Sequence, residues 1–250
     1  MSSPWFISVK RQTQPAIRLF CLPFAGGTAA TYRSWANYLP ASIELVPVEL
    51  PGRGMRFSEP LFVASQPLIA ALAEAMQPYL AQPYLFFGHS MGALLSFELT
   101  RWLATHYQSQ PQQLFVSGHR APHLAAADTT THQLSDPDLL QKVRTIDGTP
   151  KEVLEQHELM QLMLPILRAD FTICDTYQFQ PAQPLNVAIS AFGGFQDPMV
   201  KRHDIAAWRE HTTAEFQMHM FPGGHFFLQT AQAAFFKTLS HELNQILVRL

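Results

Sequence analysis

The pentapeptide Gly88-His89-Ser90-Met91-Gly92 matches the pattern G-x-S-x-G, in which the serine can act as a nucleophile. The apolar run 84–87 before it predicts a buried strand, and apolar residues recur at helical spacing from Met91 onward. A serine at such a strand-turn-helix junction is held in a strained backbone conformation at the positive end of a helix. The pattern therefore indicates a serine hydrolase. The alternative is a glycine-rich turn whose serine caps the helix.

A serine hydroxyl is a poor nucleophile near pH 7, so this interpretation requires a base and an acid that orients the base. After a strand-turn-helix serine, these partners follow in the chain order acid, then histidine. His225 follows an expected strand at 215–221 and a Pro-Gly-Gly turn that can return the side chain over the strand ends. Asp197 lies in the loop after another expected strand, 185–192. We therefore predict His225 as the base and Asp197 as the orienting acid for Ser90.

Other titratable residues after the serine have ordinary structural explanations. His219 alternates with two methionines inside an expected strand, so we expect it to face solvent or to pack against neighbours. Asp170 and Asp175 fall at helical spacing, where we expect solvation or salt bridges. None of the three is predicted to take part in the chemistry.

A serine hydrolase also needs two backbone N–H groups to hold the negative oxygen of the tetrahedral intermediate. Met91, directly after the serine, is predicted to supply one of them. The small residues of the loop 23–27 let backbone amides approach a substrate, and we predict Ala25 as the second donor, with Phe24 as the alternative. No Gly-Lys-Ser/Thr follows, so this is not a phosphate-binding loop. The other interpretation of the loop is a plain glycine-rich turn.

Short apolar runs alternate with longer amphipathic stretches, which predicts an α/β fold with a mostly parallel sheet flanked by helices. Such a sheet brings the loops of the predicted site to the carboxyl ends of its strands. The expected strands cover residues 17–22, 43–48, 84–87, 113–117, 185–192 and 215–221, and the expected helices between them cover 66–80 and 91–103.

The alternation stops at about 121–184, where only helical segments are expected, at 136–146, 151–155 and 159–177. We predict a single domain, 1–250, in which this insertion forms a helical lid over the site; ordinary peripheral packing is the alternative. Apolar residues of the insertion are expected to line an acyl chamber. They are Leu139, Leu140, Val143, Leu162, Leu164, Ile166 and Leu167.

Composition restricts the class of protein further. The 250 residues are 47% hydrophobic and only 14% charged, which excludes intrinsic disorder. A formal charge of −2 provides no basic field for nucleic acid or an anionic membrane. Cys21 and Cys174 form neither a CxxC pair nor a metal-ligand spacing, so we expect two buried thiols in a reducing compartment. With no visible export signal, a cytoplasmic location is expected.

Six motifs together resemble type II thioesterases, the free-standing α/β-hydrolases that serve non-ribosomal peptide and polyketide synthases. The resemblance covers nearly the whole chain; one departure is His119, where many of these enzymes carry arginine. The motifs are Leu22-Pro23-Phe24-Ala25-Gly26-Gly27, Leu50-Pro51-Gly52-Arg53-Gly54, Gly88-His89-Ser90-Met91-Gly92, Ser117-Gly118-His119-Arg120-Ala121-Pro122, Arg168-Ala169-Asp170 and Pro222-Gly223-Gly224-His225-Phe226-Phe227-Leu228.

The resemblance implies an α/β-hydrolase fold and hydrolysis of aberrant or stalled acyl groups from the phosphopantetheine arms of carrier proteins. It implies no metal and no organic cofactor. The partners would be acyl or peptidyl carrier proteins, bound transiently by a monomer. Because carrier domains are acidic around the pantetheinylated serine, the resemblance also implies a basic docking patch. Arg53, Arg56, Arg120 and Arg168 are its candidates, although Arg53 could instead anchor its own loop.

The residues alone establish less than the resemblance implies. They predict a serine hydrolase, whereas the thioester and the carrier protein come from the family. A carboxylesterase or lipase acting on small esters and an acyltransferase that uses an alcohol or amine in place of water would need the same residues. A non-catalytic carrier-binding module is the remaining alternative, and the complete set of Ser90, Asp197 and His225 argues against it.

Overall fold

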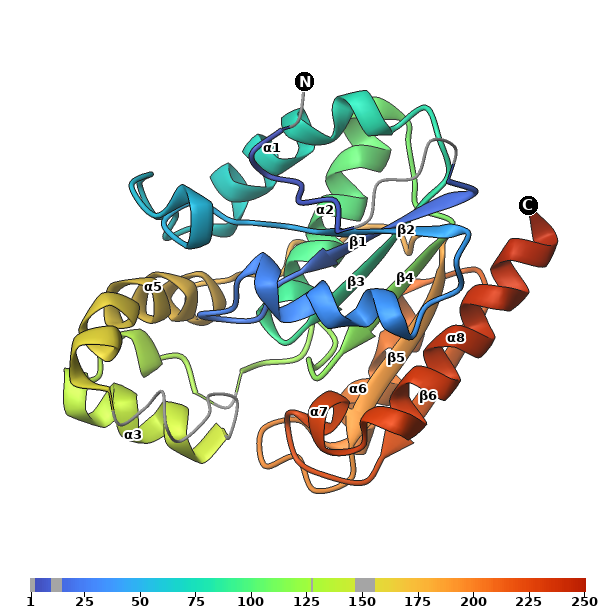
Figure 1. The fold of residues 1–250 in the computed structure, drawn as a ribbon. Coiled ribbons are helices and arrows are strands. Elements are labelled where there is room, and N and C mark those ends of the chain that lie inside the picture. The colour runs from blue at the N-terminus through green and yellow to red at the C-terminus, as the bar shows by residue number, and fades with distance from the viewer. Residues whose placement is uncertain (1–2, 10–14, 127, 147–155) are drawn as a thin grey trace.

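A computed structural model describes residues 3–9, 15–126, 128–146 and 156–250. Six strands form one sheet in the order β2-β1-β3-β4-β5-β6, and every neighbouring pair is parallel (Figure 1). The predicted parallel α/β arrangement is therefore confirmed. The strands are β1 (Ile17–Leu22), β2 (Ile43–Pro47), β3 (Tyr84–His89), β4 (Gln113–Ser117), β5 (Ala188–Gly194) and β6 (Phe216–Phe221).

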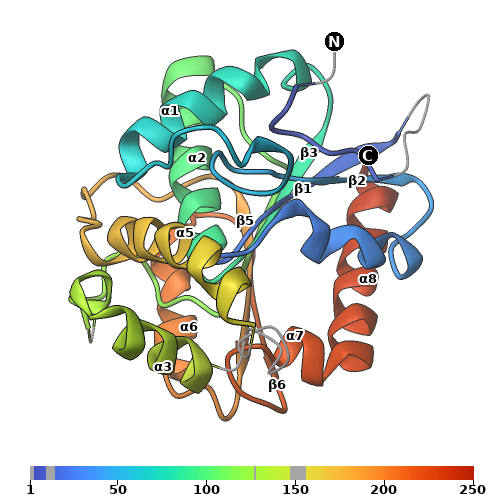
Figure 2. The ribbon, with the colours of Figure 1, turned by 60° about the vertical axis from the view of Figure 1, so that its left-hand side comes forward.

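Helices cover both faces of the sheet because successive strand residues point to opposite sides. On β1, Phe20 and Leu22 join the core under α1, α2 and α6, whereas Leu19 and Cys21 join the core under η1 and α8. The view in Figure 2 separates these two layers. The helices are η1 (Ala29–Asn37), α1 (Ser65–Met76), α2 (Met91–Tyr107), α6 (Arg202–Ala206) and α8 (Gln232–Arg249).

The strand order reverses direction between β1 and β3. From β1 the chain passes to β2 on one side, and every later strand is added on the other side. The loops that follow β1 and β3 therefore diverge at their carboxyl ends and leave a crevice, which is the usual ligand-binding position in an open parallel sheet. These two loops contain Ala25 and Ser90.

Between β4 and β5 the described residues contain helices and no strand, as expected for the insertion. They are η4 (Thr131–Gln133), α3 (Asp136–Ile146) and α5 (His157–Asp175). The expected helix at 151–155 lies outside the described residues. Both α3 and α5 lie beyond the carboxyl ends of the strands in Figure 1.

Element boundaries depart from the predictions by three residues or more at three places. The helix expected at 66–80 ends at Met76 and continues as a short 3-10 turn that contains Pro78, because proline cannot donate the next helical hydrogen bond. The strand expected from 185 begins at Ala188, since Leu185 makes only an isolated bridge to Thr212. The helix expected at 91–103 continues to Tyr107.

The remaining short elements lie in loops around the sheet. They are η2 (Gly54–Arg56), η3 (Gln77–Tyr79), η5 (Ala207–His211) and α7 (Phe227–Thr230). No helix in the described ranges combines the length and the apolar character needed to cross a bilayer. The same ranges hold no cluster of three or more His, Cys, Asp or Glu side chains arranged to bind a metal ion.

Candidate active site

Ser90 occupies a strained turn between β3 and α2. Its backbone has φ 53° and ψ −120°, a conformation that is costly for a residue with a side chain. The N–H of Ser90 donates to the carbonyl of Ser117 at 2.7 Å, which holds the turn against β4. Ser90 makes no side-chain cap hydrogen bond to α2, so the alternative of a helix-capping serine is wrong.

Steric crowding requires glycine on both sides of this turn. A Cβ atom on Gly88 would lie 2.0 Å from the carbonyl oxygen of Gly92, and one on Gly92 would lie 2.2 Å from the carbonyl oxygen of Leu22. A side chain at Gly88 would push β3 away from the start of α2, and one at Gly92 would push α2 away from the end of β1. The G-x-S-x-G pattern therefore reflects close backbone packing around Ser90.

His225 and Asp197 come together from the loops after β6 and β5. Asp197 Oδ2 accepts a hydrogen bond from Nδ1 of His225 at 2.8 Å, and both side chains are buried. Asp197 Oδ1 accepts the N–H groups of Met199 at 2.8 Å and Val200 at 3.2 Å, which fixes the carboxylate. Because the carboxylate only accepts, Nδ1 carries the ring proton and Nε2 is left as the basic nitrogen.

The two loops that carry this pair are packed directly against each other. The N–H of Gln196 donates to the carbonyl of Gly223 at 2.9 Å, and a Cβ atom on Gly194 would lie 2.3 Å from the carbonyl oxygen of Gly224. Gly223 has φ +110°, which favours glycine. The Pro-Gly-Gly turn thus returns the chain so that His225 meets Asp197.

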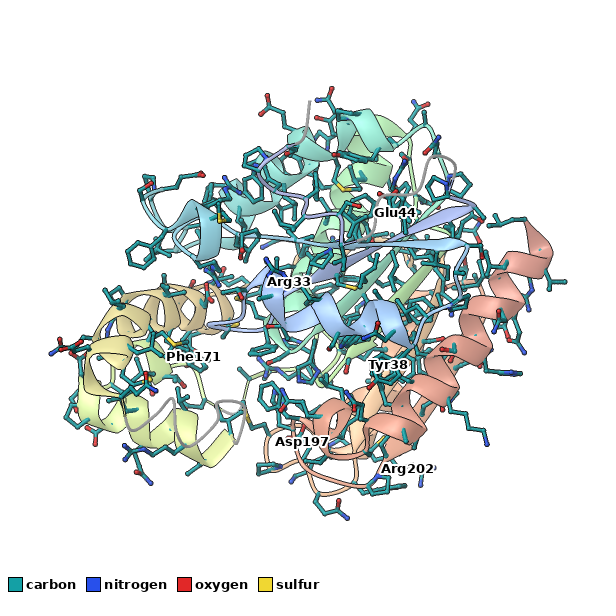
Figure 3. All side chains as sticks on the ribbon, in the orientation of Figure 1. Arg33, Tyr38, Glu44, Phe171, Asp197 and Arg202 are labelled. Atoms are coloured by element: carbon teal, nitrogen blue, oxygen red, sulfur yellow. The ribbon has the colours of Figure 1, made fainter. Side chains whose placement is uncertain are left out.

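Two cavities share the predicted nucleophile and base. The first, of about 50 Å³, is mainly apolar and is lined by Phe24, Ala25, Ser90, Val143, Ile146, Leu167, Phe171, Met199, His225 and Phe226. The second, of about 240 Å³, is more polar and is lined by Ala25, Ser90, Gly118, His119, Arg120, Asp128, Thr131, Lys142, Phe171, Cys174, Asp175, Pro198, Met199, Val200 and His225. Figure 3 labels Phe171 on α5 and Asp197 on the loop after β5. The structure therefore brings the predicted residues to one site between the sheet and the insertion.

A larger hollow than these two cavities lies elsewhere among the described residues. Its volume is about 570 Å³, and it is bounded by α1, the second half of α2 and residues 180–186. It contains none of the predicted catalytic residues, so its size does not make it the candidate site.

In the loop after β1, two backbone N–H groups already donate hydrogen bonds within the protein. The N–H of Gly26 donates to Asp170 Oδ2 at 2.7 Å, and the N–H of Gly27 donates to the carbonyl of Phe24 at 2.8 Å. Ala25 and Phe24 remain as possible oxyanion donors beside Met91. Ala25 borders both cavities, whereas Phe24 borders only the apolar one.

Two further histidines lie near His225 and stay neutral. Burial lowers the pKa of His89 well below its usual value, and burial, aided by the charge of Arg120, lowers the pKa of His119 to about 3. The ring of His89 lies 5.1 Å from that of His225 between centroids. Near pH 7 both rings are therefore neutral and place no positive charge beside His225.

The alternative acids and bases have structural partners. His219 Nε2 lies 2.5 Å from Glu242 Oε1 of α8, and Asp175 accepts from His132 Nδ1 at 2.9 Å. Asp170 is paired with Arg53 in the interior. The prediction of packing or salt bridges for these residues is confirmed, although the burial of Asp170 was not expected.

The predicted docking patch is wrong for two of its four arginines. Arg53 and Arg56 are only 3% and 5% exposed, so neither can meet a partner protein. Arg56 stacks over the ring of Trp5 and pairs with Glu59. Arg53 anchors a loop, as the alternative proposed, but the loop is that of residues 24–27.

The lining of the acyl chamber was only partly anticipated. Val143 and Leu167 line the apolar cavity as expected, whereas Leu162 is 54% exposed and does not line it. The other predicted lining residues are not part of its lining either; they are Leu139, Leu140, Leu164 and Ile166. Phe171 and Phe226 were missed. Their positions carried a signal, since Phe171 lies four residues after Leu167 on the same helix face, and Phe226 adjoins the predicted base.

Expected burial of the cysteines also holds only in part. Cys21 is fully buried within β1, whereas Cys174 is half-buried and borders the polar cavity. Both thiols are free, and burial raises the pKa of each. They are poor nucleophiles compared with a thiolate.

A parallel sheet with a strained serine turn and a paired histidine and aspartate at its carboxyl edge defines a serine hydrolase of the α/β-hydrolase fold. The chain belongs to the thioesterase domain family, whose family model matches residues 17–243. It is a thioester hydrolase, as the resemblance implied.

Three similar proteins match this chain over nearly their whole length. The chain is 45% identical to "Linear gramicidin dehydrogenase LgrE" of Brevibacillus parabrevis, over 98% of this chain and 95% of the relative. It is 39% identical to "Gramicidin S biosynthesis protein GrsT" of Aneurinibacillus migulanus, over 97% and 95%. The structure of the type II thioesterase BorB from the borrelidin biosynthetic cluster superposes with a TM-score of 0.89 at 34% identity, over 97% of this chain and 99% of that chain.

Proposed function

We propose that this protein removes acyl groups from the phosphopantetheine arms of carrier proteins in non-ribosomal peptide or polyketide synthesis. The observation that carries the proposal is the strained Ser90, open to two cavities that it shares with a His225 fixed by Asp197, in a chain of the thioesterase family. The names of relatives in gramicidin and borrelidin biosynthesis support the pathway class. The acyl groups removed are aberrant or stalled ones, so the role is editing.

The reaction has two steps, acylation of Ser90 and hydrolysis of the acyl-serine. Ser90 Oγ attacks the thioester carbonyl carbon while His225 Nε2 takes the hydroxyl proton, and the N–H groups of Ala25 and Met91 hold the negative oxygen. Collapse breaks the carbon–sulfur bond, and the pantetheine sulfur leaves with the proton from His225. Water then attacks the acyl-serine, gives a proton to His225 and forms the carboxylic acid. Ser90 Oγ recovers that proton as it leaves.

The two cavities differ in polarity, so they suit different parts of the substrate. The small apolar cavity suits an acyl chain, because its lining from the insertion is Val143, Ile146, Leu167 and Phe171. The larger polar cavity suits the amide-bearing arm of the carrier. Both meet at Ser90, where the thioester bond must lie.

The name of the Brevibacillus relative states a dehydrogenase, which would need a site for a nicotinamide cofactor. In a parallel α/β fold that site is marked by G-x-G-x-x-G after the first strand. Here residues 23–28 read Pro-Phe-Ala-Gly-Gly-Thr, and the loop lies against the serine turn. The local sequence therefore favours hydrolysis over hydride transfer.

The enzyme acts as a cytoplasmic monomer that visits its carriers transiently. A carboxylesterase on small esters or an acyltransferase remains the alternative, because either would use the same serine.

Intact-protein mass spectrometry tests the proposal. Several acyl carrier proteins are incubated with the enzyme, and loss of the acyl mass to give the free thiol form is expected. Ser90→Ala should reduce the rate by at least about 10⁴-fold while the fold is retained. Turnover of small esters equal to that of acyl carriers would favour the esterase. Transfer of the acyl group to an added alcohol or amine would favour the acyltransferase.

A further inference from the structure

Asp170 is a buried carboxylate of α5 that the proposed reaction does not use. It is fully buried and accepts three strong hydrogen bonds. Arg53 donates Nη1 to Oδ2 at 2.6 Å and Nη2 to Oδ1 at 2.7 Å, and the N–H of Gly26 donates to Oδ2 at 2.7 Å. One carboxylate of the insertion thus holds both a core arginine and the loop after β1.

A second contact from the same helix restricts this loop. Gly26 has φ +75°, and a Cβ atom there would lie 2.7 Å from Leu167 Cδ2. Leu167 and Asp170 are one helical turn apart on α5, so they lie on the same face. The helix therefore packs on Gly26 and also accepts its hydrogen bond.

The bonds of this loop determine where the N–H of Ala25 points. The carbonyl of Phe24 accepts from the N–H of Gly27 at 2.8 Å. In a trans peptide the C=O and the following N–H point in opposite directions. The N–H of Ala25, which shares that peptide plane, therefore points out of the turn. Asp170 fixes the next peptide plane, that of Ala25 and Gly26, because it accepts the N–H of Gly26.

Arg53 has a complementary electrostatic role. A lone carboxylate next to an oxyanion site would repel the developing negative charge. The two-pronged pair with Arg53 neutralises Asp170 and keeps it able to accept from the loop. Arg53 Nη1 also reaches the carbonyl of Gly27 at 3.4 Å.

We propose that Asp170 is a positioning residue for thioester hydrolysis. Together with Arg53 it holds the loop of residues 24–27 from the insertion helix, so that the N–H of Ala25 faces the thioester oxygen in the transition state. This inference rests on the proposed function. It makes the insertion part of the oxyanion site in addition to a cover over the cavity.

A double variant separates positioning from stability. Arg53→Met with Asp170→Leu removes both charges, and buried ion pairs replaced by apolar residues of similar size commonly leave stability unchanged or raised. The loop amide of Gly26 nevertheless loses its acceptor. Asp170→Asn is the single variant. Asp136→Asn is the matched control, because it breaks an exposed ion pair between α3 and Arg168 of α5 without touching the loop.

The measurements are kcat and KM on acyl-N-acetylcysteamine, counted per serine that reacts with a fluorophosphonate. Inhibition by a trifluoromethyl ketone is measured as well, because its serine adduct carries an oxyanion. In the double variant, which leaves the N–H of Gly26 without its acceptor, we expect kcat to fall by about 30- to 100-fold, with KM changed less than about threefold. Asp170→Asn keeps an amide oxygen that can still accept this N–H, so its kcat should fall less. Ketone affinity should fall by the same factor as kcat, and the control should match the native enzyme.

The outcomes are distinguishable. A folded double variant with native kcat per reactive serine would overturn the positioning role and leave a structural ion pair. An equal loss in the Asp136→Asn control would overturn it as well. A native enzyme that fails to hydrolyse the acyl thioester would overturn the proposed function, and the positioning role with it. Counting per reactive serine keeps partial unfolding from imitating a loss of kcat.

Discussion

The two long helices of the insertion line the same cavity but are held in different ways. The second half of α5 enters the main core, where Ile173 is 1% exposed, and Asp170 joins it to Arg53. In contrast, α3 buries Leu139 and Val143 in a small separate cluster with residues of α5. Its ion pairs, which include Lys142 with Asp128, lie at the surface.

Because of this difference, the two helices of the predicted lid should not move equally easily. An opening motion that carried α5 away would have to break a buried ion pair and remove apolar residues from the core. Moving α3 would separate only a small apolar cluster and exposed ion pairs, each worth about 0–1 kcal/mol. We therefore expect α5 to be a fixed wall of the site and α3 to be the part that opens. The expectation of one mobile lid over 121–184 becomes an expectation for α3.

The largest effect should come from breaking the attachment of α5. Arg53→Ala leaves the Asp170 carboxylate buried without its charge partner, and we expect the free energy of unfolding to fall by about 3–5 kcal/mol. Asp136→Asn, which breaks the exposed pair with Arg168, should change it by less than about 1 kcal/mol. Urea unfolding of both variants measures the contrast. Equal losses would mean that the two helices are held equally.

As pH falls, we expect the part of the site that contains His119 to lose stability at a higher pH than the attachment of α3 does. Folding lowers the pKa of His119 to about 3, below the value near 6.5 of an unfolded histidine. The unfolded chain then binds the extra proton below pH 6.5, so stability is lost as pH falls, by about 2 kcal/mol at pH 5 relative to pH 7.

The ion pair that holds α3, Lys142 with Asp128, responds to acid in a lower pH range than His119 does. Hydrogen bonds from Thr130 and Lys142 lower the pKa of Asp128, so its contribution is present above the unfolded value near 3.9 and is lost only as pH falls below it. Urea unfolding at pH 7 and pH 5 should show a smaller pH effect in His119→Asn, whose amide can still donate to the carbonyl of Arg120. An unchanged pH effect would contradict the assignment.

Much of the fold followed from local patterns. The strands that end in the site loops were predicted within a few residues, because buried apolar runs and their Pro and Gly boundaries are local features. The serine turn was equally local, and so was the order of Asp197 and His225 after it. The pairing of those two side chains, at 2.8 Å, agrees with the predicted order.

What the sequence could not reveal were contacts between distant segments. Arg53 and Asp170 are 117 positions apart, and nothing local distinguishes a buried arginine from an exposed one. Arg56 was therefore expected at the surface with Arg120, and Arg53 was expected either there or as the anchor of its own loop. The face of Leu162 was also misjudged, since α5 is apolar on more than one side and only packing decides which side is covered.

Hydrogen exchange should show directly that α3 opens more easily than the second half of α5. Amides of α3 should exchange about tenfold faster than those of residues 166–175, equivalent to about 1.4 kcal/mol in opening free energy. The reason is the smaller buried cluster beneath α3. Mass-spectrometric exchange on the native protein gives the comparison, with β3 as the reference for global unfolding. Equal protection of α3 and residues 166–175 would mean that the insertion moves as one body or not at all.

The smallest effect concerns the basic groups that the two helices leave accessible. Lys142 of α3 and Arg168 of α5 each have side chains 33% exposed, and Arg120 borders the polar cavity. With Arg53 and Arg56 buried, we take these three as the candidates, among the described residues around the site, for contact with an acidic carrier. Charges at a transient interface mainly set the encounter rate and are screened by salt.

Raising ionic strength from about 50 to about 300 mM should therefore lower kcat/KM on an acyl carrier protein by about threefold, and on acyl-N-acetylcysteamine by much less. Lys142→Ala should reduce this salt dependence if the carrier contacts α3, and Arg168→Ala should do so if it contacts α5. Because Arg168 also donates to the carbonyls of His132 and Leu134, its variant must first show native turnover of the small substrate. Equal salt dependence and equal efficiency for the two substrates would remove the carrier from the proposal and favour a small-molecule thioesterase.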